Sequence, residues 1–151
     1  MSDADILISL APRHAKNIFS GLKKVELRRK AMHITSGTKA WIYVTLPVGA
    51  IVGHVEINAI HALSPPVLWR RFGSVSGLSK SEFFSYFDGV LKGTALELGK
   101  TTELSNRLSL KELRLISEKF QPPQFFCRLH EDSLILKAAN ANSKNNSLKP
   151  R

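Results

Sequence analysis

Residues 6–30, ILISLAPRHAKNIFSGLKKVELRRK, predict a strand, a helix and a second strand in direct succession. Residues 6–11 are rich in leucine and β-branched side chains, which is typical of a buried strand. Residues 12–21 predict a helix, since Pro12 suits its first turn and Gly21 suits its C-terminal cap. Apolar residues recur along this segment at helical spacing, namely Ala15, Ile18, Phe19 and Leu22. We therefore expect the helix to bury one apolar stripe.

The second strand, residues 21–30, has one apolar side and one charged side. On a strand, Val25 and Leu27 would face a core while Lys24, Glu26 and Arg28 point the other way. Between residues 12 and 39 there are eight Lys or Arg residues and one acid, Glu26. This pattern has two interpretations: an ordinary solvated strand face, or the floor of a site that holds an anion.

The rest of the chain alternates strands with helices. Further strands are predicted at residues 40–46, 50–60, 90–99 and 124–130, and helices at 64–73, 78–89 and 109–120. Two of these helices start with the Ser-x-x-Glu pattern of a capping box, at Ser79 with Glu82 and at Ser109 with Glu112. The fold class is therefore α+β, and we expect five or six short strands to close into a small β-barrel with helices packed around it.

The composition indicates one folded domain with a strong positive charge. The 151 residues are 43% hydrophobic, which excludes a disordered protein. The 22 Lys and Arg residues against 12 Asp and Glu give a net charge of +10. Such an excess favours polyanionic partners, nucleic acid first, without separating RNA from DNA. From residue 138 onward large apolar residues almost vanish, so we expect a folded domain over 1–137 and a flexible basic tail over 138–151.

Several site classes have no support in the sequence. The sole cysteine, Cys127, excludes an internal disulfide and a cysteine-based zinc site, and it fits a cytoplasmic location. The five histidines show no metal-ligand spacing, and there is no glycine-rich phosphate loop. The acidic N-terminus does not match a signal peptide, and no apolar run is long enough to cross a membrane. We therefore predict no metal, no cofactor and no membrane partner, whereas the oligomeric state does not follow from the sequence.

The quoted stretch resembles the start of ASCH domains, which belong to the PUA-like superfamily. Their hallmark Gly-x-Lys-x-x-Glu-x-Arg is met here by Gly21, Lys23, Glu26 and Arg28. The resemblance continues through AWIYVTLPVGAIVGHVEI, SKSEFFSYFDG and PPQFFCRL, and so spans most of residues 5–130. It implies a β-barrel with a cleft lined by the hallmark residues, and relatives that bind RNA, nucleotides or modified nucleosides.

Physical chemistry and the resemblance together nominate the site residues. A partly buried Lys23 would have a lowered pKa and could accept a proton, while Glu26 could hold the Arg28 guanidinium in place for a ligand. The surrounding phosphate-binding field would come from five further cations: Arg13, Lys16, Lys24, Arg29 and Lys30. Tyr43 is expected to stack on a base, because its strand should run beside the hallmark strand.

Glu56 is a candidate catalytic residue under the alternative interpretation that the protein is an enzyme. It shares a strand face with His54, and the resemblance to the family's amidohydrolase branch pairs it with Lys23 as a catalytic residue. That branch has a threonine where this chain has Glu26.

The sequence thus predicts an RNA- or nucleotide-binding ASCH protein with a basic cleft, in RNA metabolism or transcription-linked regulation. The alternatives are a hydrolase acting on an N4-acetylcytidine-like nucleoside amide or on RNA, and a regulatory module that binds DNA.

Overall fold

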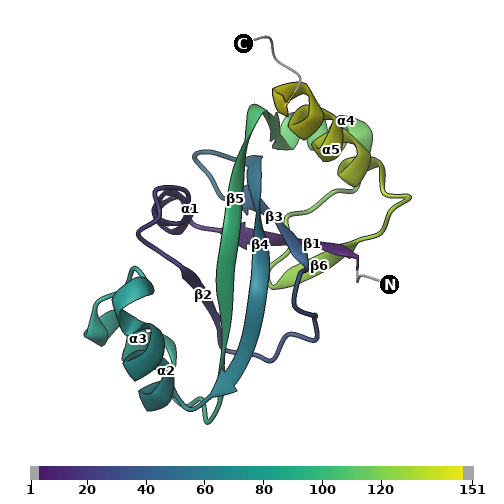
Figure 1. The fold of residues 1–151 in the computed structure, drawn as a ribbon. Coiled ribbons are helices and arrows are strands. Elements are labelled where there is room, and N and C mark those ends of the chain that lie inside the picture. Colours follow the sequence, from purple (N-terminus) through teal and green to yellow (C-terminus); the bar gives the residue numbers. More distant parts are fainter. Residues whose placement is uncertain (1–3, 148–151) are drawn as a thin grey trace.

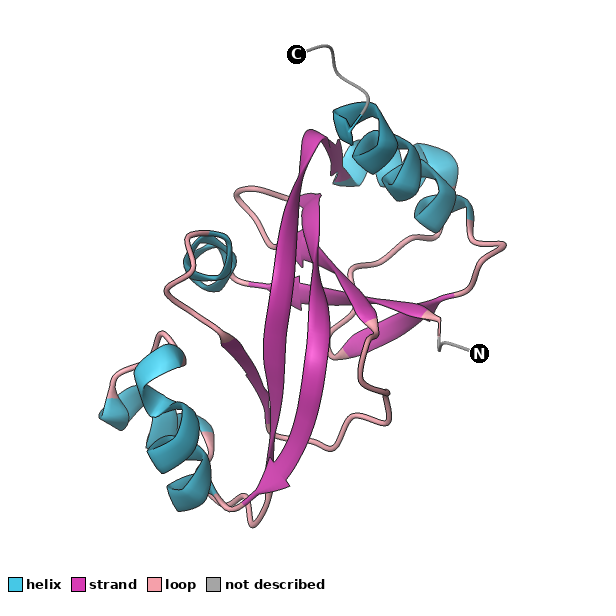
Figure 2. Ribbon diagram, in the orientation of Figure 1, coloured by secondary structure: helices cyan, strands magenta, loops and turns pink. Residues whose placement is uncertain are grey.

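The protein forms one mixed six-stranded sheet with helices packed around it (Figures 1 and 2). The computed structural model describes residues 4–147. The strands are β1 (Asp5–Leu10), β2 (Val25–Arg28), β3 (Lys39–Val44), β4 (Ala50–Leu63), β5 (Gly93–Ser109) and β6 (Phe126–Leu129). The helices are α1 (Pro12–Phe19), α2 (Pro65–Phe72), α3 (Lys80–Tyr86), α4 (Leu110–Ile116) and α5 (Leu134–Ser147), with a 3-10 turn at Gly73–Val75. The predicted α+β class is confirmed.

The sheet is not closed into the expected barrel. Its strand order is β2-β5-β4-β3-β1-β6, so β2 and β6 are its two edges. The pairing of β1 with β3 is parallel, and every other pairing is antiparallel. The expectation of five or six strands is met, but within residues 4–147 no backbone ladder joins the first strand of this order to the last.

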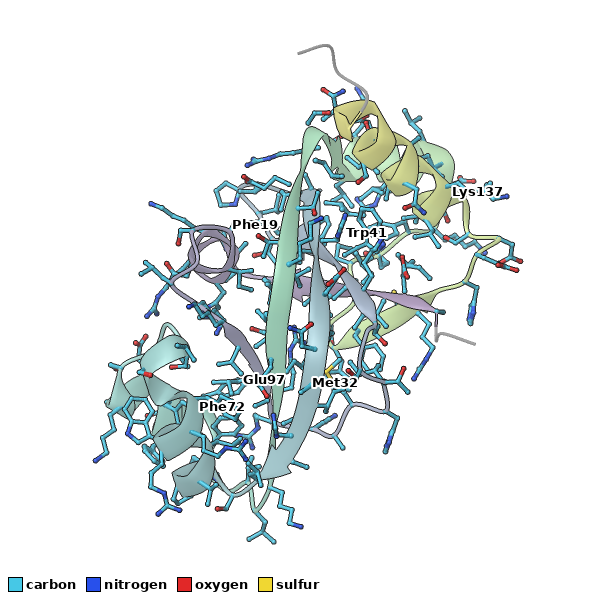
Figure 3. All side chains as sticks on the ribbon, viewed as in Figure 1. Phe19, Met32, Trp41, Phe72, Glu97 and Lys137 are labelled. Atoms are coloured by element: carbon cyan, nitrogen blue, oxygen red, sulfur yellow. The ribbon has the colours of Figure 1, made fainter. Side chains whose placement is uncertain are left out.

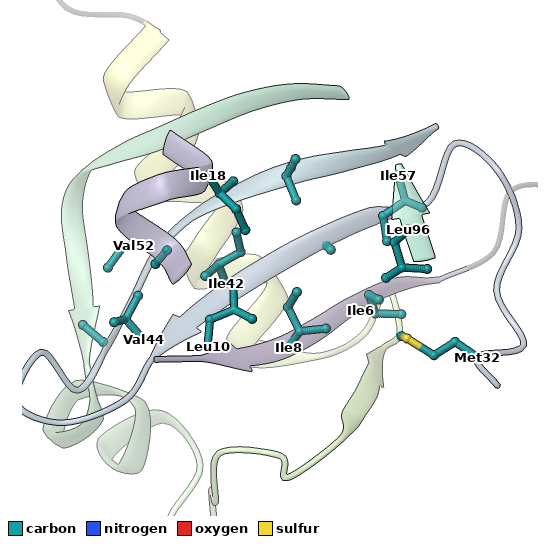
Figure 4. Close-up of a cluster of buried hydrophobic side chains, with 14 residues drawn as sticks. Ile6, Ile8, Leu10, Ile18, Met32, Ile42, Val44, Val52, Ile57 and Leu96 are labelled. Carbon is teal, nitrogen blue, oxygen red and sulfur yellow. The ribbon is translucent and has the colours of Figure 1, made fainter. Parts of the chain in front are cut away.

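Helix α1 covers one face of the sheet at the start of the chain. Its buried side chains Ala15 and Ile18 join a core cluster with Ile8, Leu10 and Ile42 of the strands below (Figure 4). The stripe was predicted from the 3.6-residue spacing, although Leu22 beyond the helix is exposed. This packing fixes the position of α1 on the sheet, and with it the positions of the polar side chains on either side of the helix.

The two longest strands, β4 and β5, pair antiparallel and run through the length of the molecule (Figure 1). The strand predicted at 90–99 begins at Gly93 and continues to Ser109. Its second half was missed because it is polar and partly exposed, so no apolar alternation marks it. Both predicted capping boxes are formed, at the starts of α3 and α4.

The C-terminal segment differs from the flexible tail expected from residue 138. Helix α5 runs through that position to Ser147, and Ala139 is fully buried beside Ile135 and Leu136. These residues belong to a core cluster with Trp41 and Leu113, so residue 138 is not a boundary between folded and unfolded chain. The sequence did not predict this packing, because the segment has few large apolar residues. A small side chain such as that of Ala139 can still fill a site in a close-packed core. Residues 148–151 lie outside the described residues.

Candidate functional site

Strand β2 divides its side chains between a core and a pocket. Val25 and Leu27 are buried in a cluster against Leu68 and Phe83 of α2 and α3. Glu26 and Arg28 point to the opposite side, as the alternation predicted. Lys24 is exposed and lies outside this pocket, whereas Lys23, just before the strand, is buried and lines it.

The three hallmark side chains form one buried charged cluster. Lys23, Glu26 and Arg28 are only 3%, 6% and 8% exposed. The Arg28 Nε donates a hydrogen bond of 3.0 Å to Glu26 Oε2, and the Lys23 ammonium lies 3.7 Å from Glu26 Oε1. Glu26 is therefore held between two cations, and each of its carboxylate oxygens faces one of them. This arrangement excludes the interpretation of a solvated strand face.

Arg28 also joins the two open edges of the sheet. Its Nη1 donates to the Phe125 carbonyl just before β6, at 2.8 Å, and its Nη2 to the Ser9 carbonyl of β1, at 3.4 Å. The guanidinium therefore spans the gap that a closed barrel would fill with a strand ladder. Because its fork is planar and rigid, these partners also fix the orientation of the group. The site is thus built where the sheet fails to close.

The pocket beside this cluster has a volume of about 340 Å³. Its wall comes from β1, α1, β2 and α3. Two residues of this wall each carry a side-chain atom that is buried without a hydrogen-bond partner among residues 4–147: Ser9 Oγ and His14 Nδ1. Buried polar groups are nearly always satisfied in folded proteins. Both unsatisfied atoms therefore belong to residues that border the pocket.

Burial controls the charge of Lys23 and His14. The pKa of the Lys23 ammonium is lowered from its ordinary value of 10.5, chiefly by desolvation, and the nearby Glu26 opposes this effect. The pKa of His14 is lowered from 6.5, first by desolvation and then by the charge of Lys23. At neutral pH His14 is therefore a neutral imidazole that can accept a proton. The lowered pKa means that Lys23 gives up its proton more readily than a solvated lysine does.

The ammonium of Lys23 is not saturated by its partners in the protein. It donates to the Ser76 carbonyl at 2.7 Å and faces Glu26 as an ion pair. An ammonium has three N–H donors, and the described residues supply these two oxygens. The third donor is available to an acceptor in the pocket.

The outer rim of the pocket is formed by an ion pair and a tyrosine. Arg13 of α1 donates to both carboxylate oxygens of Glu82, at 2.6 and 3.0 Å, and also to the Gly77 carbonyl. The hydrogen bond from Arg13, with that from the Ser79 backbone, lowers the pKa of Glu82 to about 2. Tyr86 donates to the Leu27 carbonyl at 3.1 Å, and burial raises its pKa. Arg13 is therefore at the site, but partly neutralised by Glu82.

Two nominated residues lie elsewhere. Tyr43 is buried against Phe120 in the core beneath α5, since β3 pairs with β1 and β4 and does not run beside β2. Glu56 is exposed on β4 opposite Lys39 and does not line the Lys23 pocket. Neither residue lines this pocket. The assignment of Tyr43 rested on an assumed strand order, and that of Glu56 on the strand face it shares with His54 and on the resemblance.

The remaining nominated cations are spread over the surface. Lys16 and Lys24 line two neighbouring cavities on the other flank and at the end of α1. Arg29 is exposed and donates to the carbonyls of Tyr86 and Asp88, and Lys30 is exposed just after β2. The structure therefore brings only Arg13, among the five field cations, to the pocket itself.

Four polar residues of the pocket were not nominated as site residues from the sequence: Ser9, His14, Glu82 and Tyr86. His14 sits on the polar side of α1, which the helical spacing does reveal, but nothing local says that this side faces β2. Ser9 was interpreted as part of an apolar strand. Alternation along β1 puts its side chain on the face opposite Ile8, and only the tertiary fold brings this residue to the pocket wall.

Within residues 4–147, no group of three or more His, Cys, Asp or Glu side chains is placed to hold a metal ion. None of the helices in this part of the chain is long and apolar enough to span a membrane.

Comparisons with known proteins point to one family. An ASCH domain-containing ribonuclease of Zymomonas mobilis is 35% identical over 128 residues, which is 85% of this chain and 86% of that protein. The crystal structure of an ASCH protein from Zymomonas mobilis matches with a TM-score of 0.85 at 34% identity, over 93% of this chain and 96% of the other. The large ribosomal subunit protein uL22 of Ureaplasma parvum is 28% identical over 110 residues, 73% of this chain but only 35% of that protein. No family model matches the chain.

Proposed function

This chain belongs to the ASCH domain family, and we propose that it is an RNA-binding member that holds one nucleotide unit in the Lys23 pocket. One observation carries the proposal. The pocket is lined by the buried Lys23, which bonds Ser76 and faces Glu26, and by Ser9 and His14, two residues that each carry an unsatisfied polar atom, Ser9 Oγ and His14 Nδ1. A ligand that supplies both acceptors and donors would satisfy all three groups at once.

A nucleotide carries both the hydrogen-bond acceptors and the hydrogen-bond donors that would match the polar groups of this pocket. Its phosphate oxygens accept charge-assisted hydrogen bonds, which suits Lys23 and the rim cation Arg13. Its sugar hydroxyls and base edges both donate and accept, which suits Ser9 and the neutral His14. The net charge of +10 supports a polyanion over an isolated small molecule. Two relatives are named for RNA-linked proteins, a ribonuclease and a ribosomal protein.

Cleavage of RNA is a second candidate function, favoured by the two lowered pKa values. Neutral His14 could take the proton of a 2′-hydroxyl, whose oxygen would then attack the adjacent phosphorus. The bond to the 5′-oxygen would break, and the Lys23 ammonium could donate a proton to that leaving oxygen. The name of the Zymomonas mobilis relative agrees with this reaction. Amide hydrolysis has less support, because Glu56 lies outside the pocket.

The test compares three proteins with a fluorescent single-stranded RNA, followed by anisotropy for binding and by gel for cleavage. Lys23→Met removes the buried donor and keeps the length of the side chain. Lys30→Ala is the control, since it removes an exposed charge just beyond the other end of β2. Loss of a charge-assisted hydrogen bond of about 1.5–3 kcal/mol predicts binding weaker by about ten- to a hundredfold for Lys23→Met. Equal losses in the two variants would contradict the proposal.

A further inference from the structure

A cavity of about 500 Å³ lies against a different face of α1 from the Lys23 pocket. Its residues from α1 and the C-cap follow the spacing i, i+3, i+4, i+7 and i+8, which places them on one face of a helix: Pro12, Ala15, Lys16, Phe19 and Ser20. The Lys23 pocket instead takes Arg13 and His14 from this helix, and the two share none of the described lining residues. They are therefore separate sites around α1.

Three valines line this space, which we call the valine cavity: Val44 of β3, Val52 of β4 and Val48 of the turn between these strands. Val44 and Val52 are only 3% and 5% exposed, and they belong to the core cluster that packs α1 on the sheet (Figure 4). The hydrophobic core therefore extends to the floor of the cavity. Apolar atoms that face a cavity lack packing partners on that side, so an apolar group bound there would gain contacts and leave water.

The walls of the valine cavity are held in place by contacts with the rest of the fold. The half-buried Phe19 ring packs against β4 at Gly53, where an added Cβ would come within 2.9 Å of Phe19 Cζ (Figure 3). The turn that carries Val48 is hydrogen-bonded through its backbone to the last residue of β1 and to the first residue of α4, each at 2.9 Å. A cavity that is formed before its ligand arrives loses less conformational entropy on binding.

Charged side chains stand at the rim of the valine cavity. Lys16 of α1 and Arg107 of β5 are exposed cations that line it, and Glu103 of β5 is the one acid among its described lining residues. The rim is therefore net positive, while the floor is apolar. A cationic ligand would meet two like charges, and a ligand charged along its whole length would bring charge onto the valines. The arrangement is complementary to a molecule with one anionic end and one apolar end.

We propose that the valine cavity binds a small carboxylate with an apolar body, of the size of octanoate. The apolar chain lies on the three valines beside the Phe19 ring, and the carboxylate accepts hydrogen bonds from Lys16 and Arg107. A cavity of about 500 Å³ is within the size range of small-molecule sites. This inference does not rest on the proposed function, because it uses no residue that lines the Lys23 pocket.

The first measurement is isothermal titration calorimetry of the full chain with three molecules of equal chain length and different charge: octanoate, octanol and octylammonium. Octanoate should bind most tightly and octylammonium least tightly, because the rim is net positive. The series of carboxylates from pentanoate to octanoate tests the apolar floor without any substitution. Affinity should rise about three- to fourfold for each added methylene that leaves water.

Two double variants test the rim. Lys16→Glu with Arg107→Glu reverses both cations, whereas the control, Lys111→Glu with Lys119→Glu, makes the same change in charge at exposed positions outside the cavity. The rim variant should bind octanoate more weakly by about tenfold or more, and it should bind octylammonium more tightly than octanoate. The control should keep the wild-type order of the three molecules, because salt screens exposed charges at a distance. A reversed preference reports the charge at the site, which a general loss of structure would not produce.

The absence of octanoate binding would overturn the inference, and so would a second copy of the chain that covers the cavity and excludes octanoate. Octanol or octylammonium binding to wild type as tightly as octanoate would overturn it as well, as would an affinity that does not change with chain length. Equal losses in the rim variant and its control would show that only the overall charge matters.

The Lys23→Met protein separates this inference from the proposed function. It should bind octanoate like wild type, because Lys23 does not line the valine cavity. If Lys23→Met loses octanoate binding while the rim variant keeps it, the ligand occupies the Lys23 pocket and the valine cavity is not the site. Failure of the RNA measurements would refute the proposed function and leave octanoate binding by the valine cavity untouched.

Discussion

Replacing Arg28 should destabilise the fold far more than replacing its neighbour Arg29. Arg28→Met removes three hydrogen bonds, to Glu26, to the Phe125 carbonyl and to the Ser9 carbonyl. It leaves a carboxylate that is only 6% exposed with Lys23 as its remaining cation. Breaking a buried ion pair from one side costs about 3–5 kcal/mol in the free energy of unfolding. For a chain of this size that corresponds to a fall in Tm of roughly 6–20 °C.

The assay is urea unfolding of wild type, Arg28→Met, Arg28→Lys and Arg29→Met. Arg28→Lys should fall between wild type and Arg28→Met, since an ammonium cannot reproduce the rigid fork that reaches both sheet edges. Arg29 is exposed, and its loss should cost about 1 kcal/mol or less. Combining Arg28→Met with Glu26→Gln should recover part of the loss, because no unpaired carboxylate then remains. An Arg28→Met protein as stable as Arg29→Met would refute the view that Arg28 ties the open sheet together.

Three further expectations concern the whole chain. RNA binding should weaken as salt rises, with a log–log slope of about −0.7 per phosphate neutralised, and a flat titration would contradict this. Deleting residues 138–151 should cost about 2–4 kcal/mol in urea unfolding, because Ala139 is fully buried, and an unchanged midpoint would show that this half of α5 contributes nothing. The folded-state pKa of His14 lies below 6.5, so the unfolded chain takes up its proton first as the pH falls. Stability should therefore drop below about pH 6.5 more steeply in wild type than in His14→Gln, and parallel pH profiles would contradict the burial of this imidazole.

The parts of the fold that depend on neighbouring residues were predictable from the sequence. The capping boxes at Ser79 and Ser109 form because each is decided within four residues. The alternation in β2 correctly separated Val25 and Leu27 from Glu26 and Arg28. Lys23 precedes the strand, and it was named through the hallmark motif instead of through periodicity.

The parts that depend on strand order were not predictable. Tyr43 was assigned to the site on the assumption that β3 lies beside β2, whereas β5 and β4 stand between them. Glu56 was nominated through the resemblance and the strand face it shares with His54, and neither shows whether that face borders the Lys23 pocket. Ser9 and His14 were missed because their pocket is made by bringing β1 and α1 against β2, a long-range arrangement that no local pattern encodes. Whether the sheet closes is likewise decided by pairing between strands far apart in the chain.

The most direct test of the central claim is the sign of the change in RNA affinity on replacing Glu26 by alanine. A plain cationic surface would bind RNA more tightly once an acid is removed, and the exposed acid Glu118 provides the matched control with the same change in charge. We predict that Glu26→Ala binds a single-stranded RNA about tenfold more weakly than wild type at one fixed salt concentration, because Lys23 and Arg28 lose the carboxylate that orients them. Glu118→Ala should bind as tightly as wild type or slightly more tightly. If a folded Glu26→Ala protein binds more tightly, as the charge alone would dictate, then the buried cluster is not an organised binding site.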